Sequence, residues 1–315
     1  MRAFLRKTWV KFIILMIVFT IVTSPIVILF GPFANIRRTV VGAIVRSRHP
    51  QFITWLFTPA EIQKMLGTVG TTDAQELFDF TAKSDTKLTL RQIHSTRYVG
   101  YLLEIPNPKM IQVATAPDIQ EKGDTTSNIA KANHAIAAIN AGGFYDPNGT
   151  GTGRLPYGFI LQDGKYTLGQ DVGPSESVDF IGFTKSGNLI AGSYDKTELK
   201  DMDAMWGVTF GPPLIVNGKK MITDGDGGWG IGPRTAIGQK KDGTVIFLVI
   251  DGRQPGYSTG ATLRDVQDIL YEEGCVIAAN LDGGSSSTLY YNGKVVNKPA
   301  DLLGERMIPT AFIVK

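Results

Sequence analysis

The stretch AANLDGGSSSTLYYNGKVV, residues 278–296, joins two β-strand patterns through a polar turn. The residues before Asp282 are mainly apolar, and LYYNGKVV (289–296) contains the Asn-Gly pair that is typical of a two-residue β-hairpin turn. Between the two patterns lie an aspartate, two glycines and three serines. The stretch therefore predicts antiparallel strands, and it places a carboxylate and several hydroxyl groups where a buried strand ends.

The same hairpin pattern recurs from about residue 87 to the C-terminus. Each copy places a glycine-containing turn between runs of residues that favour β-strands. The copies are LQDGKYTL (161–168), FTKSGNLIAG (183–192), IVNGKKMI (215–222) and QKKDGTVIFLVI (239–250). These patterns predict a body that is rich in antiparallel hairpins.

Helices are few in this region, and the clearest is ATLRDVQDILYEEG (261–274). Thr262 and Asp265 match a capping box at its start, and Gly274 follows its last turn. We therefore predict the α+β fold class: a single strand-rich domain of mixed or antiparallel sheet with few helices, preceded by an N-terminal transmembrane helix.

The N-terminus carries a long apolar segment, FIILMIVFTIVTSPIVILF, at residues 12–30. An α-helix needs about 20 apolar residues to cross a bilayer, and this segment is close to that length. It ends in ILFGPF rather than in a small-residue cleavage site, which favours a retained membrane anchor. Basic residues flank it on both sides, so the charge pattern leaves the orientation open. We expect a single-pass protein of the cell membrane with its body outside the cytoplasm, since long domains are exported largely regardless of charge.

Two short helical patterns follow the apolar segment. In TPAEIQKMLG (58–67), Thr58 and Glu61 match a capping box and Gly67 is a stop signal. TTDAQELFDFTAK (71–83) has an apolar side that favours a second helix. The predicted organisation is a membrane anchor at 1–35, a helical juxtamembrane connector at 36–86 and a single strand-rich domain at 87–315.

Composition and charge exclude several classes of protein. A hydrophobic content of 43% is enough for a sizeable core. The net charge of +3 is small and dispersed, so we expect no nucleic-acid partner. The single cysteine, Cys275, lies in the apolar run CVIAAN, which favours a buried thiol and excludes an internal disulfide.

Polar residues follow or adjoin four of the predicted strands. The segments are INAGGFYD (139–146), GPRTAIG (232–238), VIDGRQPG (249–256) and AANLDGGSSST (278–288). Glycines at strand ends let a ligand approach the backbone, and neighbouring side chains can converge on it. Each segment alone is typical of an ordinary turn, but the four together indicate one shared site.

These four segments, in this order, resemble the signature segments of the phosphodiester glycosidase family, and the resemblance extends over roughly residues 88–315. It implies an α+β domain that hydrolyses the bond between the anomeric carbon of a sugar and a phosphodiester. Bacterial members of the family are associated with exopolysaccharides. The implied partner is therefore a sugar-1-phosphodiester or a phosphodiester-linked glycan of the envelope or the extracellular space.

The chemistry of this bond assigns roles to the polar residues. An oxocarbenium-like transition state needs a carboxylate as nucleophile, base or electrostatic partner, and Asp251 and Asp282 are the catalytic candidates. The planar fork of arginine matches two phosphate oxygens, so Arg234 is the first candidate for a phosphate clamp and Arg253 the second. The other predicted substrate-binding residues lie at the same strand ends: Asn140, Gly142, Gly143, Thr235, Gly252, Gly283, Gly284 and Ser285.

Two other functions fit the same residues. Asp251 and Asp282 could instead hold a divalent cation such as calcium or magnesium, in a metal-dependent phosphodiesterase that breaks the P–O bond. Alternatively, the polar strand ends bind a glycan without turnover, in exopolysaccharide assembly. For the glycosidase we expect no cofactor and no metal site. Five aromatic residues occur in glycine- or proline-rich stretches where a ring can cover a sugar face: Tyr145, Tyr157, Trp206, Trp229 and Tyr257.

Overall fold

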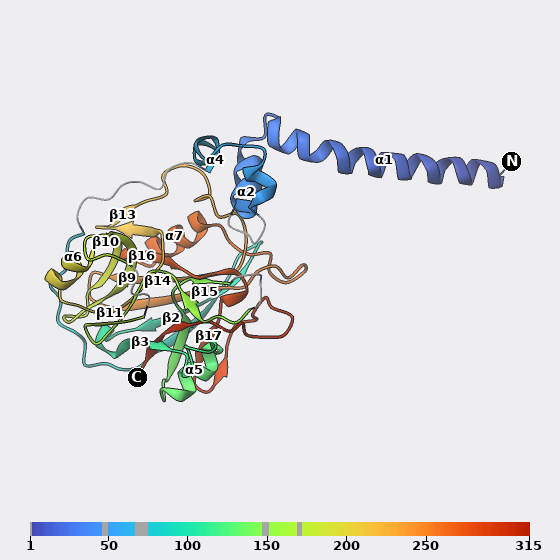
Figure 1. The fold of residues 1–315 in the computed structure, drawn as a ribbon. Coiled ribbons are helices and arrows are strands. Elements are labelled where there is room, and N and C mark those ends of the chain that lie inside the picture. Colours follow the sequence, from blue (N-terminus) through green and yellow to red (C-terminus); the bar gives the residue numbers. More distant parts are fainter. Residues whose placement is uncertain (1, 46–49, 67–74, 147–150, 169–171) are drawn as a thin grey trace. The chain divides into compact units, whose positions relative to one another are not determined.

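The computed structural model describes residues 2–45, 50–66, 75–146, 151–168 and 172–315. Its contacts divide the chain into two compact units, Met1–Gly67 with Gly228–Gly230, and Thr68–Gly227 with Ile231–Lys315. The second unit, here called the body, contains every described strand (Figure 1). The helices of the first unit are α1 (Arg2–Phe30), α2 (Ala34–Val45), α3 (Gln51–Thr54) and α4 (Pro59–Leu66).

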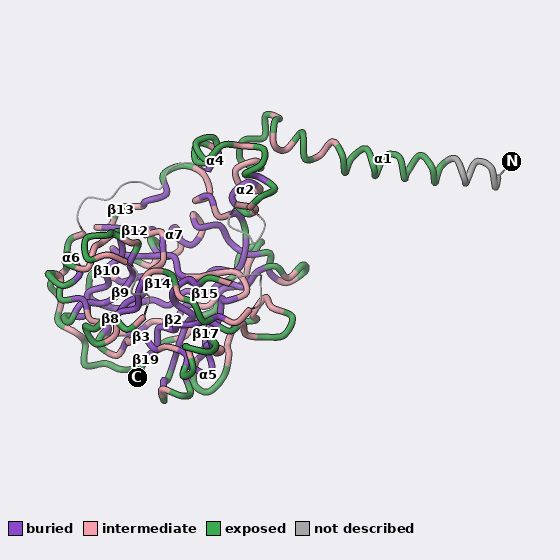
Figure 2. Tube along the Cα trace, viewed as in Figure 1, coloured by how far each residue is buried: buried purple, intermediate pink, exposed green. Residues whose placement is uncertain are grey.

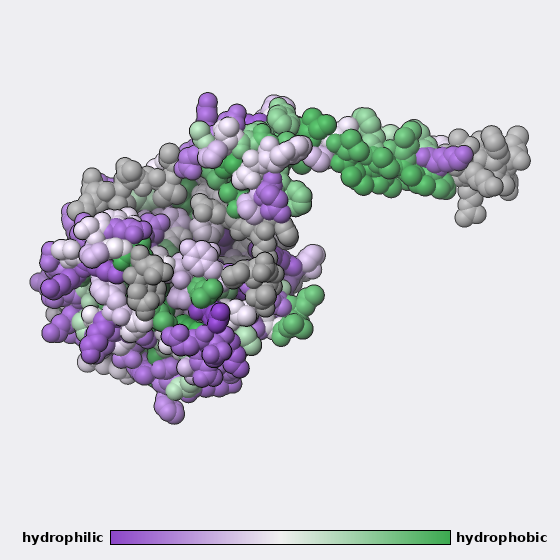
Figure 3. Space-filling view, viewed as in Figure 1, coloured by the Kyte–Doolittle hydropathy of each residue, from purple (hydrophilic) through white to green (hydrophobic). Residues whose placement is uncertain are grey.

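Helix α1 has the length and composition of a membrane span. Its segment Trp9–Phe30 has a mean hydropathy of 2.8, and it is the one described helix that meets both requirements. Most residues of Trp9–Phe30 are exposed (Figure 2), and hydrophobic residues gather along this segment (Figure 3). An export signal near the N-terminus has the same length and hydropathy as a membrane span.

Helix α4 begins at the predicted capping box. The Thr58 amide donates to Glu61 Oε2 at 2.8 Å, and the Glu61 amide donates to Thr58 Oγ1 at 3.3 Å. These two bonds satisfy backbone donors that the first helical turn leaves without partners. The predicted stop residue, Gly67, lies outside the described residues.

The body consists of three main sheets and a two-stranded ribbon, and every described strand pair is antiparallel. The seven-stranded sheet has the order β1 (Thr89–His94), β2 (Val99–Ile105), β15 (Val245–Ile250), β14 (Arg234–Lys240), β16 (Cys275–Leu281), β12 (Pro213–Val216) and β13 (Lys219–Lys220). One five-stranded sheet has the order β10 (Leu189–Tyr194), β9 (Val178–Thr184), β11 (Ala204–Thr209), β7 (Ile160–Gln162) and β8 (Lys165–Leu168). The other has the order β18 (Lys294–Val295), β17 (Leu289–Tyr291), β4 (Ala137–Asn140), β19 (Thr310–Val314) and β3 (Ile111–Thr115), and the ribbon pairs β5 (Phe144–Tyr145) with β6 (Leu155–Pro156).

The predicted hairpins form, and their turn residues explain why. In β7–β8, β12–β13 and β17–β18, both central turn residues have positive φ angles. Such turns match the twist of the flanking strands, and Asn, Asp and Gly tolerate them best. The β9–β10 and β14–β15 hairpins also form where the sequence predicts them. The turn pairs with positive φ angles are Asp163-Gly164, Asn217-Gly218 and Asn292-Gly293. The predicted α+β class is therefore confirmed.

One hydrophobic core is shared by the three main sheets. It includes Ile237 of β14, Phe183 of β9 and Phe312 of β19, and the two phenylalanine rings meet edge to face at 6.1 Å. Figure 2 shows the strands running through this buried interior. Next to Ile237, Gly238 faces the other way, where a β-carbon would contact Leu270 of α7 (Leu263–Glu272). The seven-stranded sheet therefore has the core on one face and α7 on the other.

The predicted helix at residues 71–83 is wrong for its described part. Residues 75–83 form no helix and lie along the body instead. Gln75 Oε1 accepts from the Ala191 amide at 2.8 Å, its Nε2 donates to the Leu189 carbonyl at 2.7 Å, and the Phe78 amide donates to Asn188 Oδ1 at 2.8 Å. These bonds to β10 and its turn replace the helical ones, while Phe78 packs on the core. Residues 75–86 thus belong with the body rather than with the predicted connector.

Gln75 covers the edge strand β10, and this contact has a measurable energy. We expect Gln75→Ala to lower the free energy of unfolding by about 1–3 kcal/mol, since it removes two hydrogen bonds from partly buried backbone groups. Gln92→Ala, on the exposed edge strand β1, is the control, with an expected change below about 0.5 kcal/mol. Denaturant unfolding of the full chain in detergent measures both. Equal values would mean that the segment does not contribute to the stability of the body.

Candidate active site

Three strand ends meet at one edge of the seven-stranded sheet. Arg234 at the start of β14 pairs with Ile250 at the end of β15, and Thr235 pairs with Leu281 at the end of β16. Because β15 and β16 both run antiparallel to β14, both end where β14 begins. The residues that follow them, Asp251 and Asp282, therefore lie on either side of the start of β14.

Asn140, the last residue of β4, holds this edge together. Its side chain is fully buried and donates from Nδ2 to the Asp282 carbonyl. Its Oδ1 accepts from Thr235 Oγ1 at 2.7 Å and from the Thr288 amide at 3.1 Å. Thr235 is also fully buried. The polar side-chain atoms of Asn140 and Thr235 are thus bonded to protein, and their contact with a substrate stays a prediction.

Asp251 is likewise bonded to protein on both carboxylate oxygens. Its Oδ1 accepts from Asn297 Nδ2 and from the Lys298 amide, each at 3.0 Å, and its Oδ2 accepts from the Tyr257 hydroxyl at 3.0 Å. Burial raises its pKa above the usual range, and the three hydrogen bonds oppose that shift. With 1% of its surface exposed, Asp251 fits a role in holding the 297–298 segment better than the predicted catalytic role.

Asp282 has a different environment. Its backbone is fixed, because its amide donates to the Ala141 carbonyl at 3.0 Å and its carbonyl accepts from Asn140. Its carboxylate forms no ion pair with any basic residue in the described part of the chain. Burial raises the pKa of Asp282 to about 6, although the Ser286 hydroxyl and the positive charge of Arg306 act in the opposite direction. Asp282 is partly exposed, so its backbone is held in place while a ligand can still reach the residue.

The predicted glycines allow close packing around this carboxylate. Gly284 has a φ of 64°, and a β-carbon there would lie 3.2 Å from both terminal nitrogens of Arg253. A β-carbon at Gly252 would lie 2.6 Å from the Pro233 nitrogen, and one at Gly283 would lie 3.0 Å from the Pro233 carbonyl oxygen. These glycines are required by the protein's own packing. Of these three, Gly284 comes nearest to a charged group of the site.

Gly142 and Gly143 follow β4 and are also packed against protein. The Gly142 amide donates to Thr310 Oγ1 at 3.1 Å. A β-carbon at Gly143 would lie 2.4 Å from the Phe210 ring and 2.6 Å from the Tyr157 ring. Both glycines are buried and packed against protein, and their contact with a substrate stays a prediction.

The two predicted arginines differ in the same way as the two aspartates. Arg234 is 5% exposed, its Nε donates to the Ala261 carbonyl at 2.9 Å, and it has other protein contacts. Burial, followed by the charge of Arg253, lowers the pKa of Arg234 to about 10. The guanidinium of Arg253, in contrast, has no hydrogen bond or ion pair among the described residues. Among the described residues, the guanidinium of Arg253 is thus less bonded to protein than that of Arg234, and the role of each as a phosphate ligand stays a prediction.

The backbone of Arg253 is itself unusual. Its φ of 59° lies in the left-handed region, which non-glycine residues seldom adopt, and its amide donates to the Thr259 carbonyl at 3.1 Å. Residues held in such conformations are frequent at functional sites. The side chain of Arg253 is thereby directed to the backbone of Gly284.

Two site residues, Arg306 and Asp146, have roles that the sequence did not indicate. Arg306 precedes β19, its Nη2 forms an ion pair with Asp146 Oδ2 at 2.5 Å, and its Nη1 donates to Ser285 Oγ at 3.4 Å. Its guanidinium carbon lies 4.8 Å from the centre of the Phe144 ring. Arg306 lies in none of the four strand-end segments, so no local pattern marks it. Asp146 ends the segment INAGGFYD, but no local pattern indicates its pairing, because its partner is 160 positions away.

An aromatic pair borders the same carboxylate. The rings of Tyr145 and Tyr157 meet edge to face at 4.5 Å, and both side chains are exposed. Burial raises the pKa of Tyr157, and the charge of Asp282 adds to the shift. The backbone places the two residues against the same segment, since the Tyr157 amide donates to the Gly143 carbonyl at 2.9 Å and the Asp282 amide donates to the nearby Ala141 carbonyl at 3.0 Å. Tyr145 and Tyr157, two of the five predicted aromatic residues, thus border the site.

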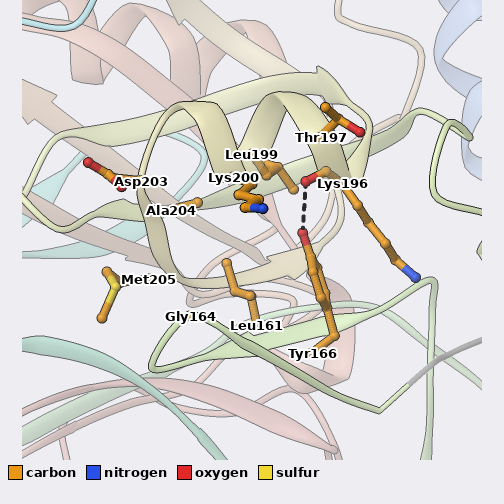
Figure 4. A pocket seen from close by; sticks show the side chains of 10 residues that line it. All are labelled: Leu161, Gly164, Tyr166, Lys196, Thr197, Leu199, Lys200, Asp203, Ala204 and Met205. Atoms are coloured by element: carbon orange, nitrogen blue, oxygen red, sulfur yellow. Dashed lines mark hydrogen bonds between the residues drawn. The ribbon is translucent and has the colours of Figure 1, made fainter.

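Other features of the body do not join this site. Cys275 is buried, and burial raises the pKa of its thiol to about 12, so it is unreactive. No group of three or more His, Cys, Asp or Glu side chains gathers at metal-binding distance within the described ranges. A cavity of about 520 Å³ lies beside β7, β11 and helix α6 (Lys196–Asp201), and it contains none of the predicted site residues (Figure 4).

Comparison with known proteins identifies related sequences. A family model described as phosphodiester glycosidase matches residues 133–315. The SPbeta prophage-derived uncharacterized protein YomE of Bacillus subtilis is 29% identical over 223 residues, which are 65% of this chain and 33% of that protein. The N-acetylglucosamine-1-phosphodiester alpha-N-acetylglucosaminidase of Bos taurus is 34% identical over 77 residues, which are 24% of this chain and 14% of that enzyme. The matched part spans a third or less of these relatives' own length.

Solved structures agree in fold. The catalytic domain of the zebrafish N-acetylglucosamine-1-phosphodiester alpha-N-acetylglucosaminidase has a TM-score of 0.62 at 21% identity, over 76% of this chain and 87% of that chain. A putative exported protein from Burkholderia pseudomallei has a TM-score of 0.53 at 17% identity, over 69% of this chain and 74% of that chain. Since the family model matches more than half of the sequence and includes the loop of Asp282, this chain belongs to the phosphodiester glycosidase family.

Proposed function

We propose that this protein is a membrane-anchored hydrolase that cleaves the glycosidic bond of sugar-1-phosphodiesters in envelope or extracellular glycans. The observation that carries the proposal is the pairing of an open carboxylate with an open guanidinium. The Asp282 carboxylate has no ion-pair partner, and the Arg253 guanidinium has no hydrogen-bond partner, among the described residues. Membership of the phosphodiester glycosidase family supports this type of reaction.

The reaction divides between these two side chains. The bond from the anomeric carbon to the phosphate oxygen breaks, and its electron pair leaves with the phosphate monoester. Arg253 stabilises the charge that develops on the phosphate, and the Asp282 carboxylate stabilises the positive charge that develops on the sugar. Water then supplies the hydroxyl group at the anomeric carbon. A phosphate leaving group needs little protonation, so the site needs charge stabilisation more than a strong acid.

Neighbouring groups would orient the substrate. The exposed rings of Tyr145 and Tyr157 offer apolar faces for a pyranose beside Asp282. Asn140 and Asp251 act indirectly, because they fix the strand ends that carry the reacting groups. The name of the bovine relative makes N-acetylglucosamine the first sugar to test.

The proposed location rests on the N-terminal helix and on a neighbour. Trp9–Phe30 is long enough and apolar enough to anchor the chain. The structural neighbour from Burkholderia pseudomallei is described as a putative exported protein, which supports an extracytoplasmic body. Protease digestion of intact cells tests this location, and a body that stays protected would contradict it.

Isotope labelling tests the reaction class. In water labelled with heavy oxygen, we expect the full chain in detergent to place the label on the sugar, because the C–O bond is the one that breaks. The assay uses a panel of sugar-1-phosphodiesters, with and without a chelator. Label on the phosphate, together with loss of turnover in the chelator, would instead identify a metal-dependent phosphodiesterase. Binding without turnover over the whole panel would leave a glycan-binding protein.

Replacing Asp282 separates its chemical role from its structural role. We expect Asp282→Asn to lower kcat by about 10²- to 10³-fold, the usual effect of losing one preorganised electrostatic contact. Asp118→Asn, at an exposed site, is the matched control and should keep full activity. Near-normal turnover in Asp282→Asn would remove Asp282 from the mechanism.

The same variant should become more stable at neutral pH. The folded state holds the Asp282 proton up to a pKa of about 6, whereas the model value is 3.8, so ionisation of Asp282 costs stability as pH rises between these values. Asparagine mimics the neutral form. Above pH 6, Asp282→Asn should therefore exceed the wild type in free energy of unfolding by up to about 3 kcal/mol, and the difference should vanish near pH 4. Denaturant titrations at both pH values measure it, and a less stable variant at pH 7 would contradict the assigned environment.

A further inference from the structure

Arg306 is held against the site by an almost buried ion pair. Its side chain is 17% exposed and that of its partner, Asp146, is 11% exposed. Such a pair is desolvated on both sides, so the guanidinium is confined to one geometry. The adjacent residue, Glu305, also fixes the backbone next to Arg306, because it accepts hydrogen bonds from the Ser127 amide and hydroxyl. Two residues further on, Ile308 exchanges backbone hydrogen bonds with Asp124.

Most donors of Arg306 are not used by the protein. A guanidinium has five N–H donors, and the bonds to Asp146 and Ser285 use two of them. The remaining three have no partner among the described residues. A largely buried cation with unused donors is costly unless a ligand completes its shell.

Arg306 also lies within electrostatic reach of both proposed reacting groups. The positive charge of Arg306 acts to lower the pKa of Asp282. The pKa of Arg253 is lowered first by burial and second by the charge of Arg306. Two guanidinium groups that repel each other beside one loop are typical of a site for an anion. Ser285 links Arg306 to that loop, and Gly284 brings Arg253 to it.

We propose that Arg306 is a second phosphate-binding residue, which forms with Arg253 a two-arginine site for the phosphodiester group, and that Asp146 is its positioning residue. The inference rests on the proposed function. When the C–O bond breaks, the phosphodiester gains one negative charge and becomes a phosphate monoester dianion. Two guanidinium groups can stabilise that added charge, and they favour phosphodiester substrates over neutral glycosides.

Binding of inorganic phosphate tests the site without turnover. We expect Arg306→Gln to weaken phosphate binding by about 10- to 150-fold, the ratio that corresponds to one lost hydrogen bond between charged groups. Arg306→Lys keeps the charge but not the planar fork, so it should fall between Arg306→Gln and the wild type. Arg91→Gln is the matched control. Arg91 lies on the edge strand β1 and is ion-paired to Glu273, so this variant should bind phosphate as the wild type does. Titration calorimetry on the full chain in detergent measures all four proteins.

The role of Asp146 is tested by coupling. Asp146→Asn keeps an acceptor for the Gly151 amide but removes the charge that holds Arg306. If Asp146 acts through Arg306, Asp146→Asn weakens phosphate binding in the wild type and has little further effect in Arg306→Gln. A purely structural role would give the same loss in both backgrounds and would overturn this assignment.

The outcomes separate the inference from the proposed function. If the wild type cleaves sugar-1-phosphodiesters while folded Arg306→Gln matches it in phosphate affinity and in kcat/KM, the inference is wrong and the function stands. If the wild type cleaves none of them, the function is wrong, and the phosphate titration still decides whether Arg306 binds the anion. If Arg306→Gln does not fold, the comparison of Arg306→Lys with Arg91→Gln decides, and equal phosphate affinities would reject the inference.

Discussion

The buried side-chain amide of Asn140 is the contact on which the geometry of the site depends. It joins three segments that are remote in the sequence, because an amide both donates and accepts hydrogen bonds. It donates to the carbonyl of Asp282 and accepts from the hydroxyl of Thr235 and the amide of Thr288. The end of β4, the start of β14 and the loop after β16 are thereby held at one point. A side chain with only donors or only acceptors could not make this junction.

Around that junction, each pair of like residues divides into a bonded member and an open member. Asp251 gives both carboxylate oxygens to Asn297, Lys298 and Tyr257, whereas Asp282 has no ion-pair partner in the described part of the chain. The two carboxylates are the same chemical group, but that of Asp251 is already bonded to protein on both oxygens. Two carboxylates in different environments can hold the fold and serve chemistry separately.

The arginines follow the same division, and this has an energetic cost. Arg234 bonds to the Ala261 carbonyl, while Arg253 and Arg306 keep donors that no described residue satisfies. Arg306 has one counter-ion, Asp146, but the repulsion between the two neighbouring guanidinium groups still disfavours the folded state. A site that is prearranged for a negatively charged group has this property, because its groups need not reorganise when the ligand arrives.

Local rules explain what the sequence by itself determined. The Asp-Gly and Asn-Gly turns specify their hairpins because few residues tolerate two positive φ angles, and Thr262 with Asp265 starts α7 because their side chains cap adjacent backbone groups. The segment around Asp282 was recognisable for a similar reason, since glycines and hydroxyl groups cluster within a few positions.

Tertiary structure alone decided the features that depend on distant partners. Residues 75–83 have an apolar side suited to a helix, but the edge of β10 supplies better hydrogen-bond partners. The buried roles of Asn140 and Asp251, and the presence of Arg306 beside Asp282, follow from contacts across more than 20 positions of sequence. Residue type and spacing show which groups can react. Only the folded chain shows which of those groups are already bonded to protein and which remain open to a substrate.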